Sequence, residues 1–272
     1  MKNINLKIFC KKLVRLLLYI GIFLNIISAI NYYEHGYSNW MLILFLSFVL
    51  ITTTYFLLRE KLDLEIKNDV WKDFLIILLL LLICIPLYLA FIYTIPWQIN
   101  TDEVSIMLSA KELIGKTSVD PFGLNPNYFG FPNLSFLIFG LAGKILGGIN
   151  LLNMRVVHAS SAILIIVLTY SFFRLNFSKL YAFGGALILG VNHALIGISR
   201  MAMRDNSGLL IEMTALTLLL LGLKRKSPFY TFLGAIISGI GFYMYYPGRI
   251  IIFIWFFTLL ISVIFFKKIL DP

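Results

Sequence analysis

Charged residues are scarce in this chain. They make up 13% of its 272 residues, whereas about 25% is usual in a soluble domain. Hydrophobic residues reach 60%, and the mean hydropathy is +0.91. This balance excludes a soluble globular domain and predicts an all-α, polytopic membrane protein.

Cysteine is nearly absent as well. Cys10 and Cys84 lie far apart, one beside and one inside an apolar run. This spacing excludes a disulfide framework and a cysteine metal site, so we interpret both as bulk side chains. The first apolar run also lacks a small-residue cleavage site, which favours a membrane span or signal-anchor over a removable signal peptide.

Long apolar runs are abundant. They cover roughly residues 13–33, 39–58, 74–95, 153–173, 180–198, 207–223, 229–246 and 250–266. A helix needs about 20 apolar residues to cross a bilayer, and a further run, Asn133–Gly147, is short by that measure. We therefore expect about eight transmembrane helices, divided between a two-span extension (1–73) and a second module (74–272).

The basic residues predict the orientation of these spans. If Asn133–Gly147 does not cross, 16 of the 23 Lys and Arg residues fall on one side, and crossing would reverse this bias. The positive-inside rule favours the first arrangement. Both termini are then cytoplasmic, Asn133–Gly147 is interfacial or re-entrant, and the long loop 96–153 is extracytoplasmic. The net charge of +10 meets anionic lipid and requires no nucleic-acid partner.

Two acids open the predicted amphipathic, interfacial helix Thr101–Ile114 in this loop. Asn100 can cap the helix, and Glu103 stands where a capping box places an acid. Asp102 and Glu103 can serve this local purpose alone, by complementing the helix dipole. They can equally belong to a site, because carboxylates near the membrane are costly to keep without a function.

A second polar cluster holds Arg200, Arg204 and Asp205 and precedes another apolar run. Arginines on an outer face run against the positive-inside tendency, although Asp205 can simply cap its helix and Arg204 can simply pair with it. Glu212 follows two turns later, as a functional candidate or as one partner of an interhelical hydrogen bond. We expect His193 to be a buried, satisfied histidine.

Acids and arginines on a lipid-facing scaffold suit a substrate that is half lipid and half polar, such as a lipid-linked phosphosugar. Its phosphate would lie near Arg200 and Arg249, with Arg204 as a further candidate. Glycosyl transfer from such a donor needs a base for the acceptor hydroxyl and positive charge at the leaving phosphate. One acidic cluster with arginines fits this chemistry better than the two separated carboxylates of a glycosidase.

Several motifs in this order resemble protein O-mannosyltransferases and their bacterial relatives, glycosyltransferase family 39. They are Asp102-Glu103, the helix segment Ala110–Gly115, the string Tyr128–Leu134, Phe139–Gly148 with Arg155, Ile198–Arg200 with Asp205, and Gly239–Arg249. The resemblance covers about residues 74–266. It implies a GT-C fold, a polyprenyl-phosphate sugar donor, inversion at the anomeric carbon, and catalytic residues among Asp102 as base, Glu103 and Asp205.

The chain departs from that family in two respects. Relatives of the aminoarabinose-transferase type often carry a lysine just before the first-loop proline, proposed to meet the donor phosphate, and here that residue is Phe131. The phosphate must then depend on Arg200, Arg204, Arg249 or a divalent cation. The family also usually continues with more spans, so we expect the 74–272 module to be incomplete.

Two other functional classes stay open. A transporter or flippase of lipid-linked sugars would use the same polar groups without glycosyl transfer, and a non-catalytic scaffold would leave Glu212 and the Arg200–Asp205 cluster unexplained. We favour a cell-envelope glycosyltransferase. Its expected partners are the lipid-linked donor, membrane lipid, and an acceptor that is a protein, lipid or glycan.

Overall fold

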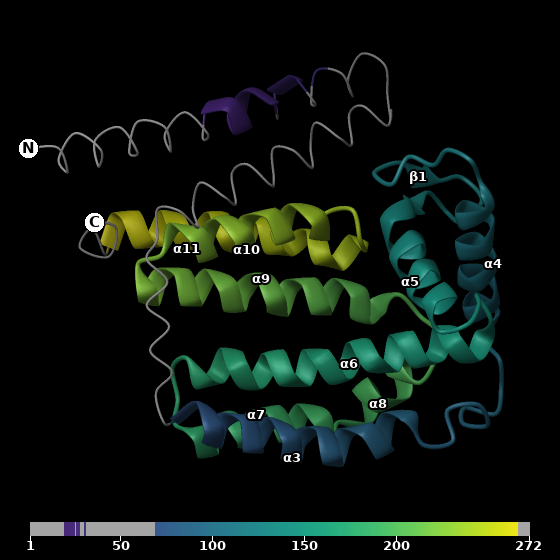
Figure 1. Cartoon of the computed structure of the whole chain (residues 1–272), viewed down its shortest axis with the longest axis horizontal. Coiled ribbons are helices and arrows are strands. Elements are labelled where there is room, and N and C mark those ends of the chain that lie inside the picture. Colours follow the sequence, from purple (N-terminus) through teal and green to yellow (C-terminus); the bar gives the residue numbers. More distant parts are fainter. Residues whose placement is uncertain (1–18, 25, 28–29, 31–68, 266–272) are drawn as a thin grey trace, which may run out of the picture. The chain divides into compact units, whose positions relative to one another are not determined.

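The computed structural model describes residues 19–24, 26–27, 30 and 69–265 of the chain (Figure 1). The few described residues between 19 and 30 are helical. The chain divides into two compact units, and the elements below belong to the unit Ile66–Lys226 and Tyr230–Pro272, apart from the first residues of α10. The expected span 39–58 and most of 13–33 lie outside the described residues, and so does most of the two-span extension.

The described unit is mostly helical, which confirms the all-α prediction for this part of the chain. Its elements are α3 (Asp69–Leu89), α4 (Thr101–Gly115), β1 (Leu124–Asn125), β2 (Phe131–Pro132), α5 (Asn133–Ile145), α6 (Leu151–Arg174), α7 (Lys179–Gly190), α8 (His193–Ser199), α9 (Asp205–Arg225), α10 (Pro228–Gly241), η1 (Tyr246–Arg249) and α11 (Ile250–Phe265). The strands form a short antiparallel pair in the long loop.

Three of these helices, α3, α6 and α9, are long and apolar enough to cross a membrane. The pair α7 and α8 makes a fourth candidate span, bent by 56° at its break. The side chain of Asn192 accepts hydrogen bonds from the amides of Ala194 and Leu195 and so starts α8 anew. Helices α10 and α11, with 14 and 16 residues, are shorter than the spans expected at 229–246 and 250–266.

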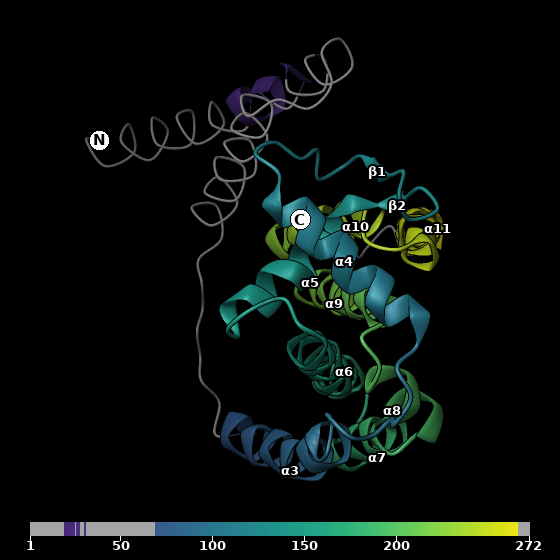
Figure 2. The same ribbon diagram turned by 90° about the vertical axis from the view of Figure 1, so that its right-hand side faces the viewer.

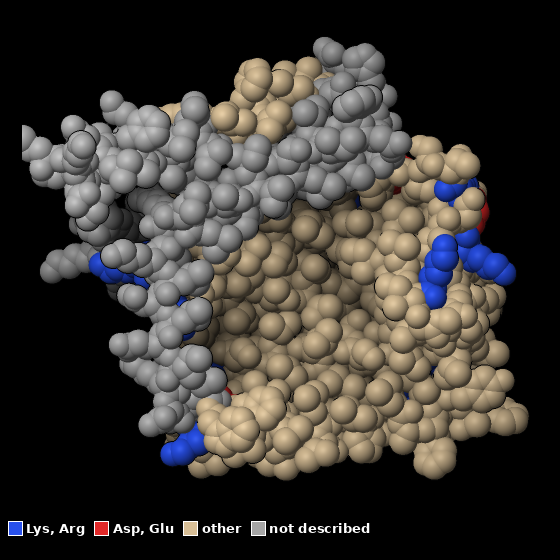
Figure 3. All heavy atoms as spheres, viewed as in Figure 1, with Lys and Arg blue, Asp and Glu red and all other residues tan. Residues whose placement is uncertain are grey.

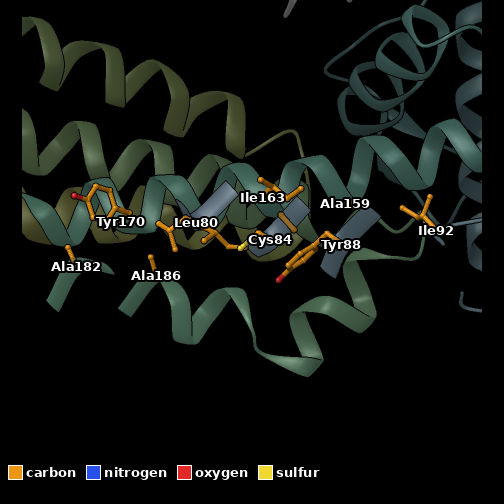
Figure 4. Close-up of a cluster of buried hydrophobic side chains, with 11 residues drawn as sticks. Leu80, Cys84, Tyr88, Ile92, Ala159, Ile163, Tyr170, Ala182 and Ala186 are labelled. Atoms are coloured by element: carbon orange, nitrogen blue, oxygen red, sulfur yellow. The ribbon is translucent and has the colours of Figure 1, made fainter. Parts of the chain in front are cut away.

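Small side chains bring α3, α6 and α7 close together. Ala159 of α6 and Ala182 and Ala186 of α7 are fully buried against Leu80 and Cys84 of α3 (Figure 4). Without a strong hydrophobic driving force in lipid, such close packing is what holds membrane helices together. Cys84 is a free, buried side chain of this cluster, as predicted.

Helices α4 and α5 lie across one end of the other helices (Figures 1 and 2). Ile106 and Ala110 of α4 pack with Phe136 of α5 in a second buried cluster. The two helices touch closely at Gly140, where a Cβ would stand 2.5 Å from the side chain of Ile114. The helix predicted at Thr101–Ile114 is therefore present as α4, and α5 is short, as expected for Asn133–Gly147.

Basic side chains gather at the ends of the long helices. The end opposite α4 holds Lys72, Arg174, Lys179, Lys224 and Arg225, at or near the termini of α3, α6, α7 and α9. There Arg174 pairs with Asp73, with Nε and Oδ1 3.0 Å apart. On the face shown in Figure 3, Lys and Arg side chains appear at both ends, with a band of other residues between them. This distribution is typical of helices that cross a bilayer.

The two ends can be placed by labelling single cysteines in a chain whose Cys10 and Cys84 are replaced by alanine. Lys111→Cys lies on the exposed face of α4, and Arg225→Cys lies at the exposed end of α9. We expect an impermeant maleimide to label Lys111→Cys on intact cells and Arg225→Cys only after permeabilisation. Labelling of Arg225→Cys on intact cells would contradict the predicted orientation.

Candidate polar site at the α4 end

A buried ion pair joins the start of α4 to the start of α6. Glu103 and Arg155 are 0% and 1% exposed. Their contact is bidentate, with Nε 2.8 Å from Oε1 and Nη2 2.9 Å from Oε2. Paired N–H···O bonds of this kind are stronger and more directional than a single contact.

Each member of the pair also binds backbone groups from other segments. Glu103 accepts the amides of Asn100, at 3.1 Å, and Ala202, at 2.7 Å. The Asn100 side chain in turn accepts hydrogen bonds from backbone amides of the first helical turn. Together with the bond from the Asn100 amide to Glu103, these bonds form the predicted capping box. Burial alone would raise the pKa of Glu103, but the Arg155 guanidinium and the two amides hold the pKa of this carboxyl below its usual value. Glu103 therefore stays charged and ties three segments together.

Arg155 continues this network into the segment between α3 and α4. Its guanidinium donates to the carbonyl oxygens of Ile92, Pro96 and Gln98 at 3.2–3.4 Å. These carbonyls follow the end of α3 and are outside regular structure. The single arginine thus satisfies backbone acceptors that would otherwise be costly to bury.

Arg200 performs a similar task at the end of α3. It donates to the carbonyl oxygens of Leu87 (2.7 Å), Ala90 (2.5 Å) and Ile95 (3.2 and 3.3 Å). A helix leaves its last carbonyls without intrahelical partners, and a cation there also complements the helix dipole. The guanidinium of Arg200 is therefore occupied by backbone oxygens.

A buried histidine fixes the turn that carries the second cluster. His158 of α6 lies with Nδ1 3.3 Å from the carbonyl of Ser199, and its Nε2 accepts the amide of Asn206 at 3.3 Å. The Asn206 side chain returns hydrogen bonds to the His158 carbonyl and, at 2.9 Å, to the Ser199 hydroxyl. These bonds hold both ends of the α8–α9 turn against α6, and they fit a neutral imidazole with its proton on Nδ1.

Arg204 lies in that turn inside an aromatic cage, formed by Tyr128, Phe131, Phe136 and Tyr245. Its guanidinium carbon is 4.0 Å from the centroid of the Phe131 ring, and 4.7–5.4 Å from those of the other three rings. The residue is 5% exposed, and within the described residues its Nε and Nη1 have no hydrogen-bond partner. Burial lowers the pKa of Arg204, and the nearby phenols and carboxylates oppose that effect.

Two carboxylates reach the cage through its tyrosines. The hydroxyl of Tyr128 donates to Asp102, with oxygen atoms 3.4 Å apart, and Tyr245 interacts electrostatically with Asp205. Both acids are exposed and both interact electrostatically with Arg204. The structure therefore brings Asp102 together with Arg204 and Asp205, about 100 positions later in the sequence.

Arg249 and Glu212 lie near the edge of this site. Arg249 stacks on Phe242 and Tyr246, and its Nε donates to the Phe242 carbonyl at 3.2 Å. Tyr246 in turn contacts Phe131 of the cage, with ring centroids 5.0 Å apart. Glu212 is half-buried on α9 beneath Gly248, and among the described residues it forms no hydrogen bond or ion pair.

An apolar cavity of about 460 Å³ has in its lining Ser207, whose hydroxyl donates to the backbone carbonyl of Arg204 at 2.6 Å. It lies between α5, α6 and α9, and its lining includes Phe139, Leu164, Leu210 and Met244. Met244 directly precedes Tyr245 of the cage, and Phe139 lies one turn from Phe136. The described surface in Figure 3 is hollowed near its centre. The lining of this cavity suits a hydrocarbon chain.

Among the residues predicted from sequence, the structure separates two groups. Asp102, Arg204 and Asp205 converge, whereas Glu103 and Arg200 are engaged in buried hydrogen bonds to neighbouring segments. The expectation for His193 was wrong, because this residue is exposed at the break before α8 and the buried, hydrogen-bonded histidine is His158. Within the described part of the chain, no three His, Cys, Asp or Glu side chains are grouped to hold a metal ion.

Comparison with known proteins adds no family to this description. No protein-family model matches the chain, and neither a curated protein nor a solved structure is detectably similar to it.

The ion pair can be tested against an exposed pair on the same helix. Glu103→Gln leaves Arg155 as an uncompensated buried charge, which typically costs about 3–5 kcal/mol. We therefore expect a large fall in the thermal unfolding midpoint of the purified protein. The matched control is Glu112→Gln, since Glu112 pairs with Lys116 at 2.7 Å on the surface of α4 and should leave the midpoint unchanged. Equal midpoints for both variants would contradict the structural role of Glu103.

The same pair predicts a pH dependence. A carboxyl whose pKa is lower in the folded than in the unfolded protein stabilises the fold above its unfolded value, and this stabilisation is lost as pH falls. The usual value is 4.5, so the loss attributable to Glu103 occurs below about that pH. We expect the midpoint of the wild type to fall more steeply on acidification than that of Glu103→Gln. Parallel pH profiles would show that Glu103 does not contribute.

Proposed function

We propose that the protein is a membrane glycosyltransferase that moves a sugar from a polyprenyl-phosphate donor to an extracytoplasmic acceptor, with inversion and with Asp102 as base. The observation that carries this proposal is the buried Arg204 guanidinium, whose Nε and Nη1 have no hydrogen-bond partner among the described residues, next to Tyr128 with Asp102 and Tyr245 with Asp205. Leaving such donors unsatisfied costs more than the typical hydrogen bond contributes. A bound anion would satisfy them.

A donor phosphate suits this position better than Arg200 or Arg249. Arg200 already donates to three backbone carbonyls, and Arg249 donates its Nε to another. Arg204 keeps Nε and Nη1 free within the described residues, and a guanidinium can present two N–H groups to two oxygens of one phosphate. Positive charge at this point stabilises the phosphate as the glycosidic bond breaks.

Asp102 is suited to act as the base. Its carboxylate is exposed, and its interaction with Arg204 brings it near the proposed phosphate without burying it in an ion pair. The acceptor hydroxyl would give its proton to Asp102 while its oxygen attacks the anomeric carbon from the side opposite the phosphate. A single displacement of this kind inverts the anomeric centre. Asp205, held by Tyr245, is placed to orient sugar hydroxyls.

The apolar cavity supports a lipid-linked donor over a soluble one. It is lined mainly by hydrocarbon side chains, and its Ser207 contacts the backbone of Arg204. A polyprenyl chain lying there would place its phosphate at the cage without exposing the hydrocarbon to water. The outer location is the one that the positive-inside rule predicts from the sequence, since 16 of the 23 basic residues fall on the other side if Asn133–Gly147 does not cross.

The alternative is a transporter or flippase of lipid-linked sugars. The two proposals differ in whether a glycosidic bond is broken. Purified protein in vesicles should release polyprenyl phosphate from a radiolabelled polyprenyl-phosphate sugar and label an acceptor in a membrane extract. Movement of the labelled lipid between leaflets without its cleavage would instead support the flippase.

The base is tested by Asp102→Asn. This change keeps size and hydrogen bonding but removes basicity, so we expect turnover to fall about 10²–10⁴-fold with little change in donor affinity. Glu112→Gln, which removes another exposed acid from the same helix, serves as the control and should retain activity. Near-normal turnover by a folded Asp102→Asn variant would remove Asp102 from this role.

The phosphate site is tested by Arg204→Lys. An ammonium keeps the charge but cannot reproduce the two parallel bonds of a guanidinium, so we expect the donor KM to rise about tenfold or more. Arg249→Lys, at the edge of the site, should have a smaller effect. A larger rise in donor KM for Arg249→Lys than for Arg204→Lys would move the phosphate away from the cage.

A further inference from the structure

The aromatic cage provides one cation where a phosphate site commonly has several. Around the guanidinium of Arg204 stand two phenols, two phenyl rings and two carboxylates. Phe131 covers the guanidinium most closely, at 4.0 Å, so a neutral ring occupies space in which a second cation could lie. Of the other arginines at this end, Arg155 and Arg200 are committed to Glu103 and to backbone carbonyls. Arg249 stacks on Phe242 and Tyr246 at the edge of the site.

From this arrangement we propose that the cage selects the phosphate by charge, binding a singly charged phosphodiester and rejecting a doubly charged phosphate monoester, with Phe131 as the residue that sets this preference. The inference rests on the proposed function, because it takes the donor phosphate to lie at Arg204. The site would bind the sugar-bearing lipid diester and release the lipid monoester.

The physical reason is the balance of charges around one anion. A single negative charge pairs with the one guanidinium of Arg204. A second negative charge finds no further unpaired cation in the cage and must lose its hydration without a partner. That uncompensated desolvation amounts to a loss of affinity of about tenfold or more.

The transfer reaction itself changes this charge. The acceptor oxygen forms a bond to the anomeric carbon while the bond from that carbon to the phosphate oxygen breaks. The electron pair leaves with the phosphate, and the acceptor proton goes to Asp102. The lipid begins as a diester with one negative charge and ends as a monoester with about 1.5–2 at neutral pH. A cage that holds the first and rejects the second would release its lipid product.

Several elements contribute the side chains that face the proposed phosphate. They are Asp102 from α4, Tyr128 and Phe131 from the long loop, Asp205 from α9 and Tyr245 from the segment before η1. His158 interacts with Asp205 and Glu103 from the side of α6. Burial raises the pKa of both Tyr128 and Tyr245, so neither phenol ionises between pH 5 and pH 8.

The experiment compares two lipids that carry no sugar. Undecaprenyl phosphate is a monoester, and its methyl ester is a diester with one charge at any pH used. Binding of each to the purified protein in neutral nanodiscs is measured at pH 8 and pH 5. At pH 8 the diester should bind at least about tenfold more tightly. At pH 5, below the second phosphate pKa of about 6, the monoester carries one charge and the two affinities should converge.

Variants then assign the preference to Phe131. Phe131→Lys adds a second cation and should reverse the order at pH 8, while Phe131→Met, uncharged and of similar size, should keep it. Equal affinities of the wild type for both lipids at pH 8, or the same order in a folded Phe131→Lys variant, would overturn the inference. If Phe131→Lys does not fold, the wild-type comparison at the two pH values decides alone.

The outcomes also separate this inference from the proposed function. Binding of both lipids that is unchanged in Arg204→Gln would remove the phosphate from the cage and overturn both proposals. Binding that depends on Arg204 but not on the charge of the lipid would overturn only the charge preference. A charge preference without transfer from any sugar-bearing donor would leave the preference standing and reject the enzyme.

Discussion

The bidentate contact between Glu103 and Arg155 is the interaction on which the rest of this end of the molecule depends. Its two side chains reach α4, α6, the segment after α3 and the turn before α9. A buried ion pair is often no more stabilising than a hydrophobic pair of similar volume, but removing one partner is costly. The pair therefore specifies one arrangement of four segments, and Asp102 and Arg204 take their positions from that arrangement.

The arginines and acids at this end have different roles, and the proposed chemistry depends on these differences. Of four arginines at this end, Arg155 and Arg200 satisfy carboxylate and carbonyl oxygens, and Arg249 lies at the edge on two aromatic rings. Arg204 alone among these four retains buried N–H groups without partners in the described structure. Of the two adjacent acids, Glu103 is buried and Asp102 is exposed. Neighbours in sequence thus have different roles because successive residues on a helix point in different directions.

Local patterns predicted part of this arrangement well. The Asn100–Glu103 capping box and the extent of α4 follow from short-range rules, and both are present. Contacts between distant residues could not be predicted in this way, since Glu103 meets Arg155 and Ala202 from 52 and 99 positions away. Hydropathy also counts apolar residues without regard to the backbone. It therefore placed a turn between the runs 229–246 and 250–266 but missed that α10 already ends at Gly241. It also could not distinguish exposed His193 from buried His158.

The bend between α7 and α8 has a consequence for the surrounding lipid. At about 1.5 Å per residue, the 12 residues of α7 span about 18 Å, and the seven residues of α8, inclined by 56°, add about 6 Å along the same direction. The sum falls short of a hydrocarbon core of about 30 Å. Where the bent pair crosses the membrane as one span, the bilayer would have to become thinner beside it, or its headgroups would have to sink toward Asn192. The protein would carry with it a collar of deformed lipid on its α7–α8 side, in which an amphiphile's polar group lies deeper than in the surrounding membrane.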